Sequence, residues 1–453
     1  MSATTEISLN SNTASTSQEA NSWSPSFSGA IAKKGIWALG DQFVVSGMNF
    51  ISTVIVGRWC GFGELGLYSL VFILLLLISV FQHSLILNPY TVFSCQLSGK
   101  RKKRYSGCIL AQQFLFMAVS AIGLLVLAIL TSYLSVNSKM VQVFFALSFT
   151  VPLFSAREFI RRFLLAQLNT SATFLLDVCV ALLQISGLLI LAITDQLTTV
   201  SACLVIALSC GLPSILWFAF NSTSFDFQRR FFRVLIRKHW NYGRWICASQ
   251  FTDVTQSYAV HWILAVMIGV AATGYYSAYY SIIMIFNPFI LAISSILLPR
   301  ASQVYHDGGV LELRRIVLKG TIVLGMIVVA LSFPVVILSD RIVQFLYEVD
   351  IASGNNGLMI ILALTVLLGA LSFASDCGLN VLGKPEINFL SGFMGLIVTA
   401  IAAPIFALFW NIEGAALGVL IAVAVASSIQ IIGFIYVTNC SHSDPVLNKS
   451  ISG

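Results

Sequence analysis

The sequence predicts an all-α polytopic membrane protein with twelve transmembrane helices in two parallel lobes of six. Three observations predict this class. Of the 453 residues, 58% are hydrophobic and only 9% are charged, whereas a soluble protein carries about 25% charged residues. The chain contains twelve apolar runs of about 20 residues, the length that crosses a bilayer as a helix. An internal repeat relates the first six runs to the last six.

The apolar runs fall into two groups of six, separated by a basic stretch at the midpoint of the chain. They lie at 35–56, 65–87, 108–131, 140–164, 172–193, 198–220, 245–268, 274–298, 317–338, 357–380, 388–409 and 413–437. This pattern predicts a disordered polar tail, an N-terminal lobe, a basic amphipathic connector, a C-terminal lobe and a cytoplasmic tail. The expected ranges are 1–32, 33–224, 225–244, 245–438 and 439–453.

The distribution of lysine and arginine supports the helix count and gives the orientation. With a cytoplasmic N-terminus, all 25 of these residues except Arg58, Lys139 and Arg341 fall on the inner side. Cytoplasmic loops carry such an excess of cations. We therefore expect a multi-pass protein of the inner (cytoplasmic) membrane of the cell with both termini in the cytoplasm.

The connector has two interpretations. Between Asp226 and Arg244 it holds six cations and one acid, and Arg230, Arg233 and Arg237 recur at helical spacing. As an amphipathic helix it would lie along the membrane surface, with cations toward anionic head groups and aromatic rings in the acyl boundary. Alternatively, it is an ordinary inner loop that is basic because inner loops are basic.

The internal repeat is visible in the first two helices of each half. Asp41 precedes a glycine by sixteen residues, as Asp253 does in the second half, and Gly66-Leu-Tyr68 corresponds to Gly274-Tyr-Tyr276. Six helices per half is an even number, so both halves enter the membrane in the same sense. Such parallel repeats place a substrate path at the interface of the halves.

Polar residues within the first and seventh helices predict a cavity. A charged group at mid-helix costs about 2.5–3.5 kcal/mol on insertion scales, so it usually faces water or a partner. In one interpretation these residues line a central cavity and bind a coupling proton or sodium ion; in the other they hydrogen-bond between helices and hold the halves together. The candidates are Asp41, Asn49, Gln250, Asp253, Gln256 and Ser257.

The fourth helix ends in a cluster of arginines. Arg157, Arg161 and Arg162 follow one another near its inner end, with Glu158 among them. Arginine binds phosphate in a forked, paired geometry, so this cluster is the candidate site for a pyrophosphate. The alternative is the positive-inside pattern with an Arg–Glu pair. Asp177 in the fifth helix is expected to have a structural role.

Several classes of function are not expected. The net charge of +7 does not indicate nucleic acid, because the cations lie in short loops between apolar runs. Nine cysteines form no C-x-x-C pair, which predicts no metal centre. The predicted outer loops are too short for a catalytic domain. We therefore expect no catalytic residues, no enzyme activity and no cofactor other than a coupling ion.

These features together resemble a known family. The paired sixes, the early acids at Asp41 and Asp253, the Gly-x-Tyr starts and the R-E-F-x-R-R motif from Arg157 to Arg162 resemble the oligosaccharide (O-antigen type) flippases. These form the polysaccharide-biosynthesis branch of the multidrug/oligosaccharidyl-lipid/polysaccharide exporter (MOP) superfamily. The resemblance implies a V-shaped, MATE-like bundle that moves polyprenyl-pyrophosphate-linked oligosaccharide outward by alternating access.

The resemblance also implies partners, and two other functions compete with it. The implied partners are the lipid-linked oligosaccharide, membrane lipid and the polymerase and glycosyltransferases of polysaccharide synthesis. The first alternative is a cation-coupled multidrug antiporter of the same superfamily, which would need an acidic, aromatic cavity. The second is a membrane glycan polymerase or glycosyltransferase, which would need catalytic groups on large outer loops.

Overall fold

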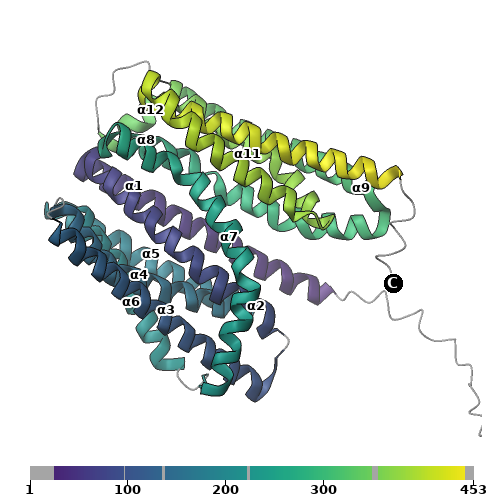
Figure 1. The fold of residues 1–453 in the computed structure, drawn as a ribbon, viewed down its shortest axis with the longest axis horizontal. Helices are drawn as coiled ribbons and strands as arrows, with labels where there is room; N and C mark the ends of the chain where they lie inside the picture. Colours follow the sequence, from purple (N-terminus) through teal and green to yellow (C-terminus); the bar gives the residue numbers. More distant parts are fainter. Residues whose placement is uncertain (1–24, 96, 135–137, 222–224, 349–355, 444–453) are drawn as a thin grey trace, which may run out of the picture.

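The computed structural model describes residues 25–95, 97–134, 138–221, 225–348 and 356–443. Most of the predicted N-terminal tail (1–24), most of the cytoplasmic tail (444–453) and part of the longest predicted outer loop (349–355) lie outside these ranges. Within them, all regular structure is helical, as predicted (Figure 1).

The helices follow one another with short connections. Their bounds are α1 (Pro25–Gln82), the π-helical turn η1 (His83–Leu87), α2 (Asn88–Ser94), α3 (Gly99–Tyr133), α4 (Ser138–Ala166), α5 (Thr170–Ile193), α6 (Thr199–Asn221), α7 (Arg229–Met267), α8 (Val270–Met284), α9 (Asn287–Ile337), α10 (Ser339–Tyr347), α11 (Gly357–Val381) and α12 (Pro385–Ser443).

Three of these helices contain two arms that meet at a turn. Gly61 in α1 and Gly309 in α9 have positive φ angles of 76° and 68°, and Asn411 in α12 has a φ of 50°. Glycine adopts such angles without steric cost. When each arm is counted as one segment, and α8 is counted together with the first arm of α9, the described chain has twelve spanning segments. The twelve-helix prediction is therefore confirmed.

Two predicted boundaries differ from the structure. Helix α1 already includes the residues from Pro25 onward, so helix occupies part of the range predicted as polar tail. Helix α12 extends to Ser443, beyond the predicted end of the C-terminal lobe at 438. The connector and the seventh spanning segment form one continuous helix, α7.

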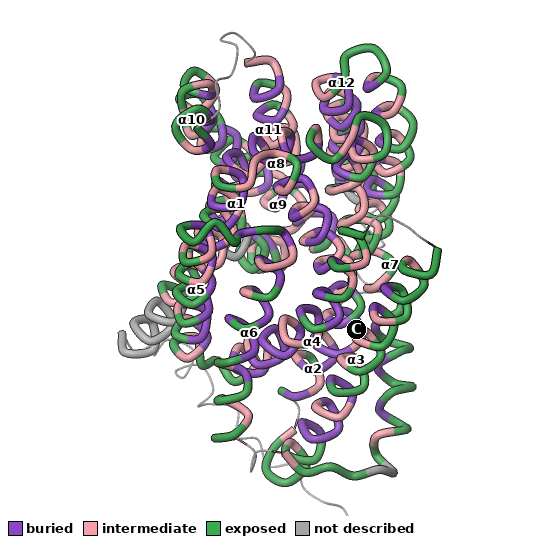
Figure 2. Tube along the Cα trace, turned by 90° about the vertical axis from the view of Figure 1, so that its left-hand side faces the viewer, coloured by how far each residue is buried: buried purple, intermediate pink, exposed green. Residues whose placement is uncertain are grey.

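The helices form two lobes that meet at one end and diverge at the other (Figure 1). The N-lobe contains α1 to α6 and the C-lobe α7 to α12. Large apolar side chains such as Val119 (62% exposed) and Ile129 (68%) lie on the outer surface of α3. Figure 2 shows buried positions between the helices and exposed positions along the outer faces. An outer face of this kind matches a lipid environment.

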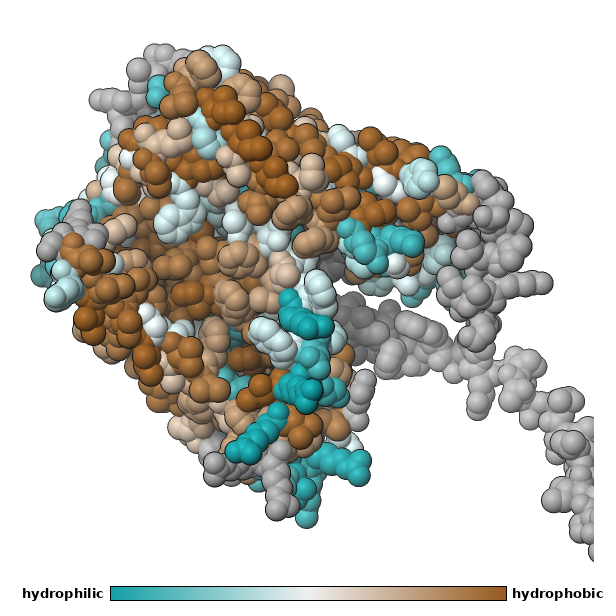
Figure 3. All heavy atoms as spheres, in the orientation of Figure 1, coloured by the Kyte–Doolittle hydropathy of each residue, from teal (hydrophilic) through white to brown (hydrophobic). Residues whose placement is uncertain are grey.

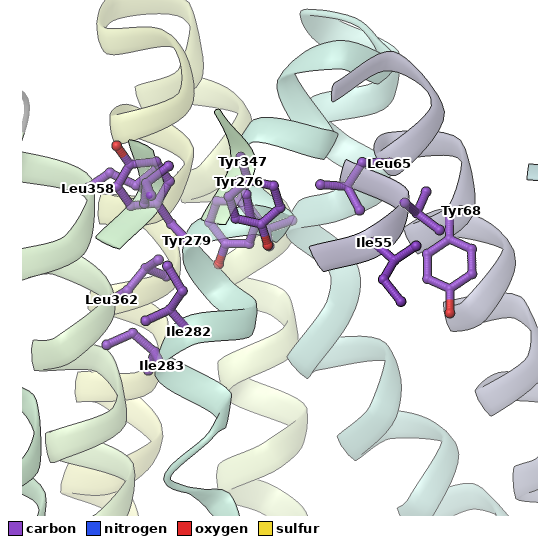
Figure 4. Packing of buried hydrophobic residues seen from close by; sticks show 14 of the residues in the cluster. Ile55, Leu65, Tyr68, Tyr276, Tyr279, Ile282, Ile283, Tyr347, Leu358 and Leu362 are labelled. Atoms are coloured by element: carbon purple, nitrogen blue, oxygen red, sulfur yellow. The ribbon is translucent and has the colours of Figure 1, made fainter. Parts of the chain in front are cut away.

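The largest buried cluster joins the lobes at their common end (Figure 4). Tyr68 and Leu65 come from the N-lobe, and Tyr276, Tyr279 and Tyr347 from the C-lobe. A smaller cluster of the N-lobe includes Leu235 from the connector part of α7, and another lies within the C-lobe. Among the described residues, the largest core that the lobes share therefore lies at the end that the sequence assigns to the outer side.

At this common end, the two glycines matched by the internal repeat lie against each other. A Cβ atom added to Gly66 would lie 1.9 Å from the carbonyl oxygen of Val270, and one added to Gly274 would lie 1.9 Å from that of Phe62. The contact is reciprocal, as expected for equivalent helices related by a pseudo-two-fold axis. Only glycine permits this crossing, which we call the glycine crossing.

The connector part of α7 is attached to the N-lobe by His239. Its Nδ1 donates to Gln112 Oε1 at 2.9 Å, and its Nε2 lies 3.1 Å from the hydroxyl of Tyr105. Burial lowers the pKa of His239 to about 4, and the charge of Lys238 adds to this. The imidazole is therefore neutral at pH 7 and can accept at Nε2. Leu235 is also buried, so part of the predicted lipid-facing side of the connector covers protein instead.

Replacing His239 with alanine should detach the connector. The substitution leaves the buried Gln112 Oε1 without its donor, and each such group costs about 1–3 kcal/mol. We expect trypsin to cleave at Arg233 and Arg237 about ten times faster than in the wild type. Trp240→Ala, which alters an exposed neighbour (55% exposed), is the control. Equal cleavage rates in the His239→Ala and control proteins would contradict this anchoring role.

Candidate functional site

A cavity made of three adjoining pockets lies between the lobes. The outer pocket (about 190 Å³) and the N-lobe pocket (about 440 Å³) share Asn49, Phe72 and Tyr258. The N-lobe pocket and the C-lobe pocket (about 410 Å³) share Asp253. Figure 3 shows that this face of both lobes is mainly apolar, and that hydrophilic residues follow α7 along the N-lobe.

The cavity brings the two predicted clusters together. Arg157 and Asp253 both line the N-lobe pocket, although they belong to different halves of the chain. Asn49 lines the outer and N-lobe pockets, and Gln256 lines the C-lobe pocket. Ser257 is exposed and lines none of the three described pockets; its hydroxyl donates to the backbone oxygen of Asp253 at 2.8 Å.

The N-lobe side of the cavity contains a chain of alternating charges, which we call the N-lobe ion network. Asp177, fully buried, accepts from Arg157 Nε at 3.1 Å and from Arg161 Nε at 2.8 Å. Arg161 Nη2 continues the network to Asp41 at 2.5 Å, and Arg157 Nη1 continues it to Glu158 at 3.0 Å. Helices α1, α4 and α5 are thereby connected by charge-assisted hydrogen bonds, which are stronger than neutral ones.

The network continues through His83 to the third arginine. His83 Nε2 lies 3.6 Å from Glu158 Oε2, and Arg162 Nη2 lies 3.4 Å from His83 Nδ1. In the described part of the chain, Arg162 forms no ion pair with a carboxylate, whereas Arg157 and Arg161 each contact two acids. Of the three arginines predicted to bind pyrophosphate, Arg162 therefore has the fewest acidic partners, although only Arg157 lines one of the three pockets.

The predicted acids have different surroundings. Asp41 is buried and paired with Arg161 in its own lobe, and Asp253 is exposed in the cavity. Neither carboxylate makes a described bond between the lobes. Among the predicted cavity residues, Gln250 makes such a bond: its Oε1 accepts from the Ser84 hydroxyl at 2.8 Å.

Sequence reasoning missed the second wall of the C-lobe pocket. Asp376 and Asn380 on α11 and Asn388 on α12 line it opposite Asp253. The available signal was the four-residue spacing of Asp376 and Asn380, which places both on one face of an otherwise apolar helix.

Comparisons with known proteins agree with this architecture. The family profile described as "Polysaccharide biosynthesis protein" matches residues 96–349. No curated protein matched the chain.

The chain is also similar to solved transporter structures. An inward-facing MATE family multidrug resistance transporter of the MOP superfamily aligns with a TM-score of 0.70 at 15% identity, over 91% of this chain and 96% of the other. The outward-facing form aligns with a TM-score of 0.64 at 16% identity, over 92% and 96%. A MOP superfamily transporter from Pyrococcus furiosus, described as having a binding pocket of reverse polarity, aligns with a TM-score of 0.64 at 15% identity, over 90% and 95%.

These structures share the fold with the present chain, and the profile covers more than half of its length. The chain therefore belongs to the polysaccharide biosynthesis protein family and is a multi-pass membrane protein with the fold of the MOP-superfamily transporters.

Proposed function

We propose that the protein moves polyprenyl-pyrophosphate-linked oligosaccharide from the inner to the outer leaflet of the cytoplasmic membrane by alternating access. The oligosaccharide would then be available to a polysaccharide polymerase, and glycosyltransferases would supply it from the cytoplasmic side. Family membership supports a role in polysaccharide synthesis, and the fold supports transport rather than catalysis.

The observation that carries this proposal is the polar cavity lined by both lobes and closed at the glycine crossing. A lipid-linked saccharide has a polar head and a long apolar tail. The cavity offers charged and amide groups to the head, while the apolar outer faces of the lobes leave the tail in the bilayer. Rocking the lobes about their shared core would expose the head to the other side.

We propose that the arginines of α4 recognise the pyrophosphate, with Arg162 as the direct contact. Arg162 ends the N-lobe ion network and carries guanidinium donors besides the one that it directs to His83 Nδ1. Arg157 and Arg161 hold the network in position through Asp177. Asp41 and Asp253 are the proposed sites of a coupling proton or sodium ion, because each is a carboxylate within a spanning helix at or near the cavity.

A cation-coupled multidrug antiporter is the second candidate. The C-lobe pocket favours it, since Asp253 and Asp376 give that pocket an acidic character. The two functions predict opposite phenotypes. A deletion strain should lose surface polysaccharide and accumulate lipid-linked saccharide while its sensitivity to cationic dyes is unchanged. Intact polysaccharide with increased dye sensitivity would instead establish the antiporter.

Arg162→Gln tests the pyrophosphate contact. A hydrogen bond to a charged group contributes about 1.5–3 kcal/mol, so the loss of this cation should reduce export about tenfold or more. The readout is surface polysaccharide at matched protein levels. Arg101→Gln, which removes an exposed inner-side arginine on α3, is the control. Export at the wild-type level in Arg162→Gln would remove Arg162 from the proposed site.

A further inference from the structure

We propose that the C-lobe pocket is a separate subsite for the sugar rings of the substrate, while the N-lobe side takes the pyrophosphate. This inference rests on the proposed function and assigns the two ends of the substrate to different lobes.

The C-lobe pocket has the side chains that carbohydrate binding requires. It is lined from α7, α11 and α12 by two carboxylates, amides and serine hydroxyls. Hydroxyl groups of a sugar both donate and accept, so they pair with carboxylates and amides, which offer two polar atoms side by side. The main polar residues are Asp253, Gln256, Asp376, Asn380, Asn388 and Gln430.

These polar groups are available, in contrast to those of the N-lobe. Among the described residues, the side chains of Asp253, Gln256 and Gln430 have no hydrogen-bond partner. Asn388 donates to Asn380 Oδ1 at 3.2 Å, but its own Oδ1 is buried and accepts from no described group. Buried polar atoms are usually paired, so the unpaired Asn388 Oδ1 indicates a ligand at this pocket. The other three side chains are not buried and can turn toward the same ligand.

Two glycines hold the polar face of α7 close to α12. A Cβ atom on Gly395 would lie 2.1 Å from Gln256 Nε2, and one on Gly392 would lie 2.9 Å from Asp253 Oδ1. Any larger residue at Gly395 would displace the Gln256 amide. The two glycines of α12 therefore lie against the Gln256 amide and the Asp253 carboxylate, which keeps both groups at the pocket.

An aromatic side chain adds a second element of sugar recognition. Phe389 lines the pocket, is 44% exposed and stacks on Phe393 with ring centroids 6.1 Å apart. Its exposed ring can pack against the apolar face of a sugar. The pocket volume of about 410 Å³ falls in the range of small-molecule sites, about 300–1,000 Å³.

Charge fixes which end of the substrate enters which lobe. Asp253 and Asp376 repel a pyrophosphate but accept hydrogen bonds from neutral hydroxyls. The guanidinium of Arg162 provides donors on the N-lobe side. A substrate that is anionic at one end and polyhydroxylic at the other is therefore oriented across the cavity.

Binding of two probes to the purified full-length protein in lipid nanodiscs tests this assignment. The probes are farnesyl pyrophosphate and farnesyl pyrophosphate extended by a glucose unit. In the double variant Asn388→Leu/Gln430→Leu, we expect affinity for the glucosylated probe to fall about tenfold, through the loss of two hydrogen bonds. Affinity for farnesyl pyrophosphate should not change, which also shows that the variant is folded.

The control variant and the remaining outcomes distinguish the sugar subsite from the proposed function. Ser428→Ala, on the same helix as Gln430 but outside the pocket, should bind both probes as the wild type does. Equal effects of the double variant on both probes, or none on either, would overturn the sugar subsite while leaving the proposed function intact. Failure of the wild type to bind either probe would overturn the proposed function, and the subsite with it.

Discussion

Replacing Asp177 with alanine is expected to destabilise the N-lobe by about 3–5 kcal/mol, the cost of breaking a buried ion pair on one side. Asp177 is fully buried and accepts from Arg157 and Arg161. Arg157 is itself only 2% exposed, so without Asp177 its guanidinium keeps only Glu158 as a partner. The measurement is the thermal unfolding midpoint of the detergent-purified protein.

The matched control is Asp307→Ala, which removes an aspartate whose side chain is 82% exposed. Its unfolding midpoint should equal that of the wild type. Asp177→Asn should be nearly as unstable as Asp177→Ala, because the amide preserves the shape but not the charge. A wild-type midpoint in Asp177→Ala would show that the N-lobe ion network does not stabilise the fold.

The second large effect is expected at the glycine crossing. In Gly66→Ala, the new Cβ would lie 1.9 Å from the carbonyl oxygen of Val270, so the two helices cannot close at the outer end. The protein should insert normally but populate states open to the outside. In a chain whose native cysteines are replaced, Ser277→Cys, in the outer pocket, should then react faster with an impermeant maleimide added outside.

Gly63→Ala is the control, because a Cβ there would have nothing within 4 Å. It lies one turn away on the same helix and should leave labelling unchanged. If Gly66→Ala were labelled at the rate of Gly63→Ala, the helices would tolerate a side chain at the crossing. The crossing would then not be the element that closes the cavity.

Much of the fold could be predicted because a helix that crosses lipid needs a fixed apolar length, and inner loops carry an excess of cations. Apolar length and the cation pattern predict twelve segments and two like-oriented lobes, and the match of Gly66 with Gly274 identified two residues that meet in the structure. The chain bends that join α1, α9 and α12 into long helices were not predicted, since Gly61, Gly309 and Asn411 resemble many other polar or small residues.

The site was less predictable because it depends on pairing between helices. The spacing of Arg157 and Arg161 in the sequence predicts a phosphate-binding site. In the structure, however, both arginines contact Asp177 and other acids. One sequence does not show which carboxylate each arginine reaches. The repeat matches the stretch around Asp376 with the arginine cluster of α4, so it gave no reason to place Asp376 beside Asp253.

Transport of the substrate by the purified protein tests the central claim most directly. Vesicles would carry a fluorescent polyprenyl-pyrophosphate oligosaccharide in both leaflets, and an impermeant quencher added outside would report inner-leaflet probe that becomes accessible. We predict that the wild type exposes this protected fraction, and that Arg162→Gln and Gly66→Ala do so at least about tenfold more slowly. A wild-type rate equal to that of protein-free vesicles would contradict the account.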